Sequence, residues 1–477
     1  MSIKFGTGGW RAIIGDEFTK ANVQRLTAAI ARKMKDEGAA ERGFIVGYDR
    51  RFLSKEAAHW AAEVMAGAGI PCMVVEREAP TPLIMFAVRY YELPYGMAVT
   101  ASHNPAVYNG VKVFTRGGRD ADELVTADIE KYIAALPEGD IATVPYEQGL
   151  RSGAIQIINP MNAYIDSIIR AVNMDAIRSR GLKVALDPMF GVSKTALSTI
   201  LITARCDVDV IHERHDPLFG GRLPAPNSKT LIRLQDFVVE NGCDIGIATD
   251  GDADRLGVID DRGEFLHPNK ILVLLYYYLL KYKGWHGAVV RNIATTHLLD
   301  AIAADFGEQC YEVPVGFKYV SGKMAETGAV IGGESSGGLT VRGHIQGKDG
   351  IYAAALLVEM LSVTHRRLSD IYQEIKEEYG SFEMVERGYR FSLDEKERIH
   401  KTLMIEKRLP EFETKIGKVS YADGCKVYFE DGGWVLARFS GTEPLLRVFC
   451  EMESTEHAAK IADEMAAFLK LDDSGLE

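Results

Sequence analysis

A serine beside a histidine marks the first segment that could carry out chemistry. Thr100-Ala-Ser-His-Asn-Pro105 follows the apolar run Tyr95–Val99, so Ser102 and His103 are expected on a polar loop at the end of a strand. Most Ser-His pairs are ordinary turn residues. Lys112 comes shortly afterwards, and a lysine beside a nucleophilic serine could donate a proton or hold phosphate. The segment is therefore a candidate catalytic loop.

Three alternating aspartates form the sharpest single feature of the sequence. Asp250, Asp252 and Asp254 follow the short apolar strand Ile245–Ala248. Two carboxylates about 4 Å apart repel by roughly 4 kcal/mol at an effective dielectric constant of about 20, so three held together need a cation. An all-oxygen ligand set favours Mg²⁺, Mn²⁺ or Ca²⁺ over zinc. An EF-hand is excluded, because Arg255 stands where its sixth position requires glycine. The pattern indicates a hard-metal loop, with a solvated acidic turn as the alternative.

A glycine-rich segment, Gly332-Gly-Glu-Ser-Ser-Gly-Gly338, carries one carboxylate and two hydroxyls. Glu334 and Ser336 could bond neighbouring hydroxyls of a sugar, although a flexible surface turn would have the same composition. The segment also matches the hydrolase motif G-x-S-x-G, with Ser335 as the nucleophile. That motif requires a helix after the serine, and the following residues predict a turn and a strand. Sugar recognition is therefore favoured over hydrolysis.

A tight loop near the C-terminus combines arginines, hydroxyls and a glycine. Arg438-Phe-Ser-Gly-Thr-Glu-Pro444, with Arg447 just beyond it, is expected between two strands. An arginine fork, two hydroxyls and a free backbone amide at Gly441 are what a phosphate dianion requires. A plain hairpin turn would differ mainly in lacking the flanking arginines. The sequence contains no Walker A motif, so nothing in it indicates ATP.

These loops need elements to position them, and one pattern recurs three times along the chain. Each copy is a short apolar strand, a helix and a second strand, with spacing that leaves room for one crossover helix and so makes each strand pair parallel. The strand pairs begin at Phe44 and Cys72, at Lys183 and Val208, and at Ala288 and Tyr311. Beyond Ser369 the pattern changes to a helix over 396–409, strands over 425–430, 433–439 and 446–451, and a helix over 456–469.

The predicted fold class is α/β, with three βαβ-containing mixed-sheet domains followed by a C-terminal α+β domain. Clusters of turn residues place the domain boundaries. The predicted domains are 1–150 with the serine loop, 151–259 with the aspartate loop, 260–370 with the glycine-rich loop, and 371–477 with the Arg438 loop.

Composition and charge exclude several classes of protein. The 477 residues are 47% hydrophobic and 26% charged, as in soluble globular proteins. A net charge of −12 argues against nucleic acid or an anionic membrane as the main partner. The six cysteines form no C-x-x-C pair and indicate thiols of a reducing compartment. Without a secretory signal or a bilayer-length apolar run, the chain is expected to be soluble and cytoplasmic.

The four loops, in this order, resemble those of the α-D-phosphohexomutase family, which includes phosphoglucomutase and phosphomannomutase. The resemblance extends over essentially the whole chain. In that family three α/β domains and a C-terminal α+β domain surround one deep cleft, and each domain contributes one loop. The resemblance implies the same arrangement around one central cleft in this chain.

The resemblance also implies roles for the residues of each loop. Ser102 matches the serine that carries the transferable phosphoryl group, and the three aspartates match the Mg²⁺ ligands, whose shell the phosphoserine completes. Glu334 and Ser336 match the contacts to sugar hydroxyls. The residues that match the grip on the non-reacting phosphate are Arg438, Ser440, Gly441 and Thr442.

Further residues are assigned around these loops. Phe5-Gly-Thr-Gly-Gly-Trp-Arg11 resembles the opening segment of the family, whose arginine lies near the phosphoserine. His103 joins the catalytic set, and Arg255 and Arg447 join the substrate-binding set. Two lysines compete for the general acid/base role. Lys112 matches a lysine of bacterial phosphomannomutases, and Lys318 matches the proton-transfer lysine of phosphoglucomutase.

The implied reaction interconverts hexose 1-phosphate and hexose 6-phosphate through a phosphoserine and a hexose 1,6-bisphosphate, with one Mg²⁺ per active site. Glucose is the first expected sugar and mannose the second. Ser335 and Gly338 depart from the common forms of the sugar loop, so a phosphoglucosamine mutase with the same chemistry is the alternative enzyme. A non-catalytic sugar-phosphate-binding protein is the alternative outside the enzymes. The expected partners are small hexose phosphates, and the expected state is a monomer or a homodimer.

Overall fold

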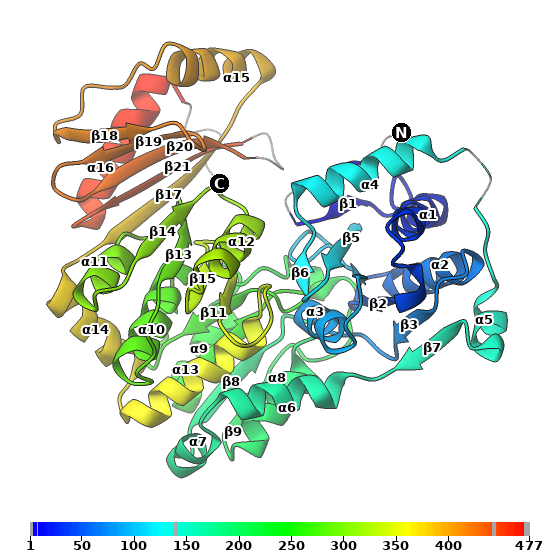
Figure 1. The fold of residues 1–477 in the computed structure, drawn as a ribbon. Coiled ribbons are helices and arrows are strands. Elements are labelled where there is room, and N and C mark those ends of the chain that lie inside the picture. The colour runs from blue at the N-terminus through cyan, green and yellow to red at the C-terminus, as the bar shows by residue number, and fades with distance from the viewer. Residues whose placement is uncertain (1–2, 7, 138, 140, 441–444, 472–477) are drawn as a thin grey trace.

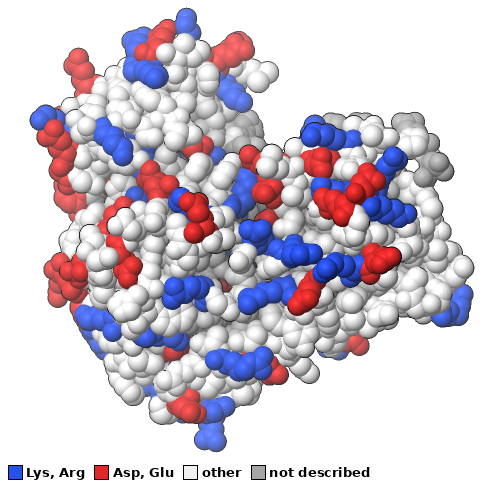
Figure 2. All heavy atoms as spheres, viewed as in Figure 1, with Lys and Arg blue, Asp and Glu red and all other residues white. Residues whose placement is uncertain are grey.

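The computed structural model describes residues 3–6, 8–137, 139, 141–440 and 445–471. Its strands form four sheets, each with its own helices (Figure 1). The first domain (blue to cyan) and the fourth (orange to red) lie apart, and the second and third connect them (Figure 1). Figure 2 shows an open notch between the first and fourth domains, with acidic and basic side chains interspersed on this face. The predicted fold class is confirmed.

The first sheet has the strand order β1-β5-β4-β2-β3-β7, and β6 pairs with β5. The strands β4, β2, β3 and β7 run parallel, whereas β5 is antiparallel to β1, β4 and β6. Every residue of β2 and β4 is buried, as expected for parallel strands covered on both faces. The strands are β1 (Trp10–Ile13), β2 (Phe44–Tyr48), β3 (Cys72–Val75), β4 (Tyr95–Val99), β5 (Tyr108–Thr115), β6 (Arg119–Asp120) and β7 (Ile155–Ile158). The helices are α1 (Lys20–Asp36), α2 (Ser54–Gly67), α3 (Thr81–Tyr90), α4 (Glu123–Ala135) and α5 (Tyr146–Ser152).

The second sheet has the order β12-β11-β10-β8-β9, with β10, β8 and β9 parallel. Its strands are β8 (Lys183–Asp187), β9 (Asp207–Val210), β10 (Ile245–Thr249), β11 (Leu256–Ile259) and β12 (Phe265–Leu266). Its helices are α6 (Met161–Ala171), α7 (Met174–Arg180), α8 (Lys194–Thr203) and α9 (Ile232–Asn241).

The third sheet has the order β14-β13-β15-β16, and only β16 runs antiparallel to its neighbour. Its strands are β13 (Val289–Asn292), β14 (Cys310–Val313), β15 (Ile331–Gly333) and β16 (Leu339–Val341). Its helices are α10 (Pro268–Lys281), α11 (Leu298–Asp305), α12 (Phe317–Thr327), α13 (Gly350–Thr364) and α14 (Leu368–Tyr379). The three predicted strand–helix–strand pairs are therefore parallel as expected, in the first three sheets.

The fourth sheet is antiparallel throughout, in the order β17-β21-β20-β19-β18. Its strands are β17 (Glu383–Arg390), β18 (Ile416–Ser420), β19 (Cys425–Phe429), β20 (Trp434–Phe439) and β21 (Leu445–Met452), with helices α15 (Leu393–His400) and α16 (Thr455–Leu469). The helix predicted over 396–409 is shorter, because α15 ends at His400 and only a π-helical turn, Lys401–Ile405, follows it.

One apolar core extends over the first three domains, and the first and the fourth domains each have a further core of their own. Ile45, Leu186 and Leu357, one from each of the first three domains, belong to the shared core. Helix α13 joins the third domain to the second, because it is apolar around almost its whole circumference and packs against α7 and α8, and α3 of the first domain packs against α6. The fourth core lies between its own sheet and α16.

The three predicted domain boundaries do not coincide with the ends of the sheets and helices in the structure. The break at 150/151 falls inside α5, and β7 still belongs to the first sheet. The break at 259/260 separates β11 from β12, which pair in one sheet, and the break at 370/371 falls inside α14. Turn residues show where a chain reverses, but they do not show whether the next strand joins the same sheet.

Two further observations concern the cysteines and the helices. All six cysteines are unpaired thiols. Among the helices of the described residues, none combines the length and the apolar character that a membrane span needs.

Candidate active site

Ser102 lies three residues after the end of β4 and is only 1% exposed. Its Oγ donates a hydrogen bond to Asp250 Oδ2 over 2.8 Å, and His103 Nδ1 lies 3.4 Å from Ser102 Oγ. The φ angle of Ser102 is 52°, in the left-handed region that favours glycine. Such a strained residue persists only where neighbouring contacts hold it. The serine hydroxyl is thus fixed toward the aspartate loop of the second domain.

Arg51, which no motif indicated, supplies much of that support. Its guanidinium donates to four backbone carbonyls of the serine loop, those of Ser102 (2.7 Å), Asn104 (2.6 Å), Pro105 (2.9 Å) and Tyr108 (3.0 Å). The buried carboxylate of Asp49 pairs with Arg51 and accepts the Thr100 hydroxyl over 2.6 Å. The sequence contained one signal that could have pointed to Arg51. Asp49-Arg-Arg51 directly follows β2, which is parallel to β4 and ends at the same edge of the sheet.

The aspartate loop after β10 gathers its three carboxylates. Asp250, Asp252 and Asp254 are all buried, and each offers an oxygen within 4.8 Å of the others. The Oδ1 atoms of Asp252 and Asp254 are buried without a hydrogen-bond partner. Unpartnered buried carboxylate oxygens are costly, and a hard cation would satisfy them. The buried triad can therefore hold a metal ion, and Ser102 Oγ lies beside it. Thr81, at the start of α3, donates its hydroxyl to Asp252 Oδ2 over 2.6 Å.

Two lysines contact this triad. Lys112 Nζ donates to Asp252 Oδ2 and to Asp254 Oδ2, each over 2.6 Å. Lys348, which the sequence did not indicate, lies 2.7 Å from Asp254 Oδ2. Lys318, the second proton-transfer candidate, pairs instead with Glu123 on α4 over 2.5 Å. The structure therefore brings Lys112 to the carboxylates and joins Lys318 to the first domain by a different contact.

Burial and mutual charge set the protonation of these groups. Burial, with the charges of Asp252 and Asp254 added, raises the pKa of Asp250 well above its ordinary value. Burial opposes the ionised form of Asp254 too, but Lys112 and Lys348 outweigh it and hold that pKa well below its ordinary value. Burial, with Arg255 and Arg11 nearby, holds the pKa of His103 well below its ordinary value, so its ring is neutral near pH 7.

Two predicted arginines border the same site. The backbone amide of Arg255 donates to Asp250 Oδ1 over 3.1 Å, and Arg255 forms a β-bridge with Gly338 of the glycine-rich loop. Arg11 pairs in register with Gly110, two residues before Lys112 on β5. The Nε atoms of Arg11 and Arg255 are both buried without a hydrogen-bond partner. Burial lowers the pKa of Arg11, and the charge of Arg255 contributes to this shift.

The glycine-rich loop joins β15 to β16. Glu334 is buried, and its Oε1 accepts Asn292 Nδ2 over 3.1 Å and the Gly316 amide over 2.9 Å. Ser336 is exposed at the tip of the loop. The loop is followed by a strand, as predicted, so the helix that the hydrolase motif needs after Ser335 is not present.

The Arg438 loop joins β20 to β21. Arg438 Nε donates to Asp423 Oδ1 over 2.8 Å, and the Ser440 amide donates to the Leu445 carbonyl over 2.8 Å. Arg447 lies opposite Arg438 in the strand register and contacts Glu386 Oε1 over 2.7 Å. Gly441 and Thr442 lie outside the described residues.

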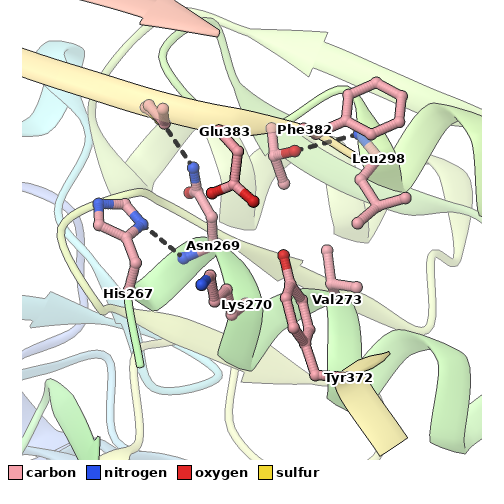
Figure 3. Close-up of a pocket in the computed structure, with 10 residues that line it drawn as sticks. His267, Asn269, Lys270, Val273, Leu298, Tyr372, Phe382 and Glu383 are labelled. Carbon is pink, nitrogen blue, oxygen red and sulfur yellow. Dashed lines mark hydrogen bonds between the residues drawn. The ribbon is translucent and has the colours of Figure 1, made fainter. Parts of the chain in front are cut away.

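A separate pocket of about 130 Å³ lies where the third domain meets β17 (Figure 3). His267, Lys270, Tyr372 and Glu383 are among the residues that line it. None of its lining residues belongs to the predicted site. The pocket therefore lies at a junction between domains and is separate from the serine and aspartate loops.

Four family models match the chain in order. They are the phosphoglucomutase/phosphomannomutase alpha/beta/alpha domains I (residues 2–139), II (162–263) and III (267–379), and the C-terminal domain (392–468). Together with the site, these matches define an enzyme of the phosphohexomutase type. The chain belongs to the phosphoglucomutase/phosphomannomutase family, as the resemblance predicted.

Individual relatives resemble the chain along nearly its whole length. A phosphoglucomutase/phosphomannomutase from Thermococcus kodakarensis is 30% identical over 96% of this chain and 96% of its own. A phosphoglucosamine mutase from Acetivibrio thermocellus is 30% identical over 98% of this chain and 99% of its own. The crystal structure of a putative phosphomannomutase from Thermus thermophilus has a TM-score of 0.85 at 30% identity, covering 98% of this chain and 100% of that one.

Proposed function

We propose that the protein interconverts hexose 1-phosphate and hexose 6-phosphate, with glucose as the first sugar and mannose as the second. The reaction runs through a phosphoserine at Ser102 and a hexose 1,6-bisphosphate. The observation that carries the proposal is the hydrogen bond from Ser102 Oγ to Asp250, one of three buried carboxylates. Phosphoryl transfer needs a nucleophile beside a site for a hard metal ion, and this chain, a member of the family, has that arrangement.

The transfer has two matched steps. In the first, the P–Oγ bond of phosphoserine 102 breaks and a P–O bond forms to the free hydroxyl of the hexose phosphate. The hydroxyl proton passes to a base, and Ser102 Oγ takes up a proton to become a free hydroxyl. The bisphosphate then turns end over end, and its other phosphoryl group returns to Ser102. Asp250, Asp252 and Asp254 would hold Mg²⁺, which when bound neutralises charge on the transferred group.

The other loops bind the substrate. Glu334 and Ser336 would orient the sugar hydroxyls. Arg438 would hold the phosphate that does not react, since a guanidinium binds a phosphate dianion by charge-assisted hydrogen bonds. Ser440, Gly441 and Thr442 complete the proposed grip, and Arg11, Arg255 and Arg447 add positive charge.

Proton transfer is assigned to one of two lysines. Burial opposes the charge of Lys112, but Asp252 and Asp254 outweigh it and raise its pKa, so it stays protonated and is suited to donating a hydrogen bond. As a proton-transfer group it would need these carboxylates to be occupied by a metal ion. Lys318 is the other candidate. Lys112→Met and Lys318→Met, compared for kcat at saturating substrate, separate them, because only the proton-transfer variant should lose most of its kcat.

A coupled assay with glucose 1-phosphate, mannose 1-phosphate and glucosamine 1-phosphate tests the function. With Mg²⁺ and a catalytic amount of hexose 1,6-bisphosphate, we expect the highest kcat/KM with glucose 1-phosphate. The name of the Acetivibrio thermocellus relative supports phosphoglucosamine mutase as the second candidate, and a preference for glucosamine 1-phosphate would establish it. Binding of all three sugars without turnover of any would identify a non-catalytic sugar-phosphate-binding protein.

We also propose a cytoplasmic location. The six unpaired cysteines support it, because thiols persist in reducing compartments.

A further inference from the structure

Asp423 contacts two domains with one carboxylate. It lies between β18 and β19 of the fourth domain, and its Oδ1 accepts a hydrogen bond from Arg438 Nε over 2.8 Å. Its Oδ2 accepts the backbone amide of Val315, in the third domain, over 2.7 Å. A carboxylate that binds a guanidinium and an amide at once restrains both donors.

The residue after Val315 continues this connection to the sugar loop. The amide of Gly316 donates to Glu334 Oε1 over 2.9 Å. The two amides belong to adjacent residues and are joined through one α-carbon, so only the φ and ψ angles of Val315 can change the separation of their acceptors. Asp423 and Glu334 are therefore linked to each other through the Val315–Gly316 backbone.

We propose that Asp423 is a positioning residue that sets the distance between Arg438 and Glu334. The proposal rests on the proposed function, in which Arg438 binds the distant phosphate while Glu334 binds the sugar. A hexose phosphate must contact both residues at the same time, so it is sensitive to their separation. Inorganic phosphate needs only the proposed grip around Arg438, without Glu334, and can follow the guanidinium when it moves. Asp423 thereby adapts the site to the length of a hexose phosphate.

Asparagine at position 423 should disturb this distance without removing bulk. The new amide group presents a donor to either Arg438 Nε–H or Val315 N–H, which are donors themselves. One of the two contacts is then lost while Arg438 keeps its charge and its strand. Binding a hexose phosphate must then bring Arg438 and Glu334 back to the required separation. The free-energy cost of ordering them weakens substrate binding.

The test compares Asp423→Asn with Asp431→Asn, a matched change at an exposed aspartate on the turn between β19 and β20. The measurements are KM and kcat for glucose 1-phosphate with saturating bisphosphate, and the inhibition constant of inorganic phosphate. For Asp423→Asn we expect a KM about tenfold higher, as for a lost hydrogen bond to a charged group. We expect kcat and the inhibition constant to change less than about twofold. Asp431→Asn should match the wild type in all three.

Two results would overturn the inference. A KM that stays at the wild-type value would remove the positioning role, and an inhibition constant that rises together with KM would mean that Asp423 only supports the phosphate grip. Melting temperatures check folding, and Asp423→Ser serves as a second variant if Asp423→Asn does not fold. The proposed function fails separately, when the wild-type protein turns over none of the hexose phosphates.

Discussion

Ser102 Oγ lies 2.8 Å from Asp250 Oδ2, although 148 residues of chain separate the two. The serine follows a strand of the first sheet, and the aspartate follows a strand of the second. The proposed nucleophile and a proposed metal ligand therefore come from different domains. Their contact depends on how the first two domains pack, and the shared apolar core fixes that packing.

Ser102→Ala should remove the phosphoryl carrier while leaving the substrate loops intact. We expect kcat to fall by about three orders of magnitude or more, because no other group can take its place in the transfer. Binding of glucose 6-phosphate should persist, and calorimetry can measure it. Peptide mass spectrometry of the wild-type protein should find phosphate on Ser102. The same phosphopeptide should appear in Ser335→Ala, and phosphate on Ser335 in the wild type would contradict the assignment.

Asp252→Ala should abolish turnover and metal binding while the fold survives. Lys112 still has Asp254 as a partner in this variant, so no buried charge is left alone. Mg²⁺ should raise the melting temperature of the wild type by binding only the folded state, and that rise should disappear in Asp252→Ala. Asp175→Ala, at a side chain that is 94% exposed, is the control and should keep the rise. An Asp252→Ala protein that is fully active in EDTA would disprove the metal site.

Arg51→Met should destabilise the protein, because it leaves Asp49 buried without its charge partner and four carbonyls without their donor. Breaking a buried ion pair by removing one partner costs about 3–5 kcal/mol of unfolding free energy. Urea denaturation can measure the loss, with Arg42→Met at an exposed position as the control. Arg51→Lys should recover part of the stability but not the fork geometry. A loss below about 1 kcal/mol for Arg51→Met would show that the serine loop is held by other contacts.

His267 should make the protein less stable in acid. Burial, with Lys270 nearby, lowers the pKa of His267 from 6.5 to about 4. Between these values the unfolded chain binds more protons than the folded one, so stability falls as the pH drops from 6.5 toward 4.

The change His267→Asn isolates this effect. His267 caps α10 by accepting the Asn269 amide, and asparagine can cap a helix without titrating (Figure 3). From pH 7 to pH 5 the variant should lose about 1–2 kcal/mol less unfolding free energy than the wild type. Urea denaturation at both values measures the difference, and equal losses would contradict the assignment.

Much of the fold could be predicted from local pattern. The three parallel strand pairs were predicted because a short apolar run, one helix length and a second run allow little else. Strands β17 and β18 were missed, because they are edge strands with half-buried and exposed residues and show no continuous apolar run. The domain boundaries shifted because strand pairing across a turn is a tertiary contact.

The sequence by itself determined which segments could carry chemistry. Ser102, the three aspartates and Glu334 each stand in a loop bordered by strands, and Arg438 lies near the end of a strand that leads into such a loop, where residue type is informative. Only the tertiary structure decided what those loops contact. Arg51, Lys348 and Asp423 are ordinary charged residues in sequence, and each acts on groups far away along the chain. From the sequence, Lys112 and Lys318 were equal candidates for proton transfer. In the folded protein the packing of the domains places Lys112 against Asp252 and Lys318 against Glu123. A short-range pattern specifies a residue's chemistry, but its partners depend on how separate sheets pack together.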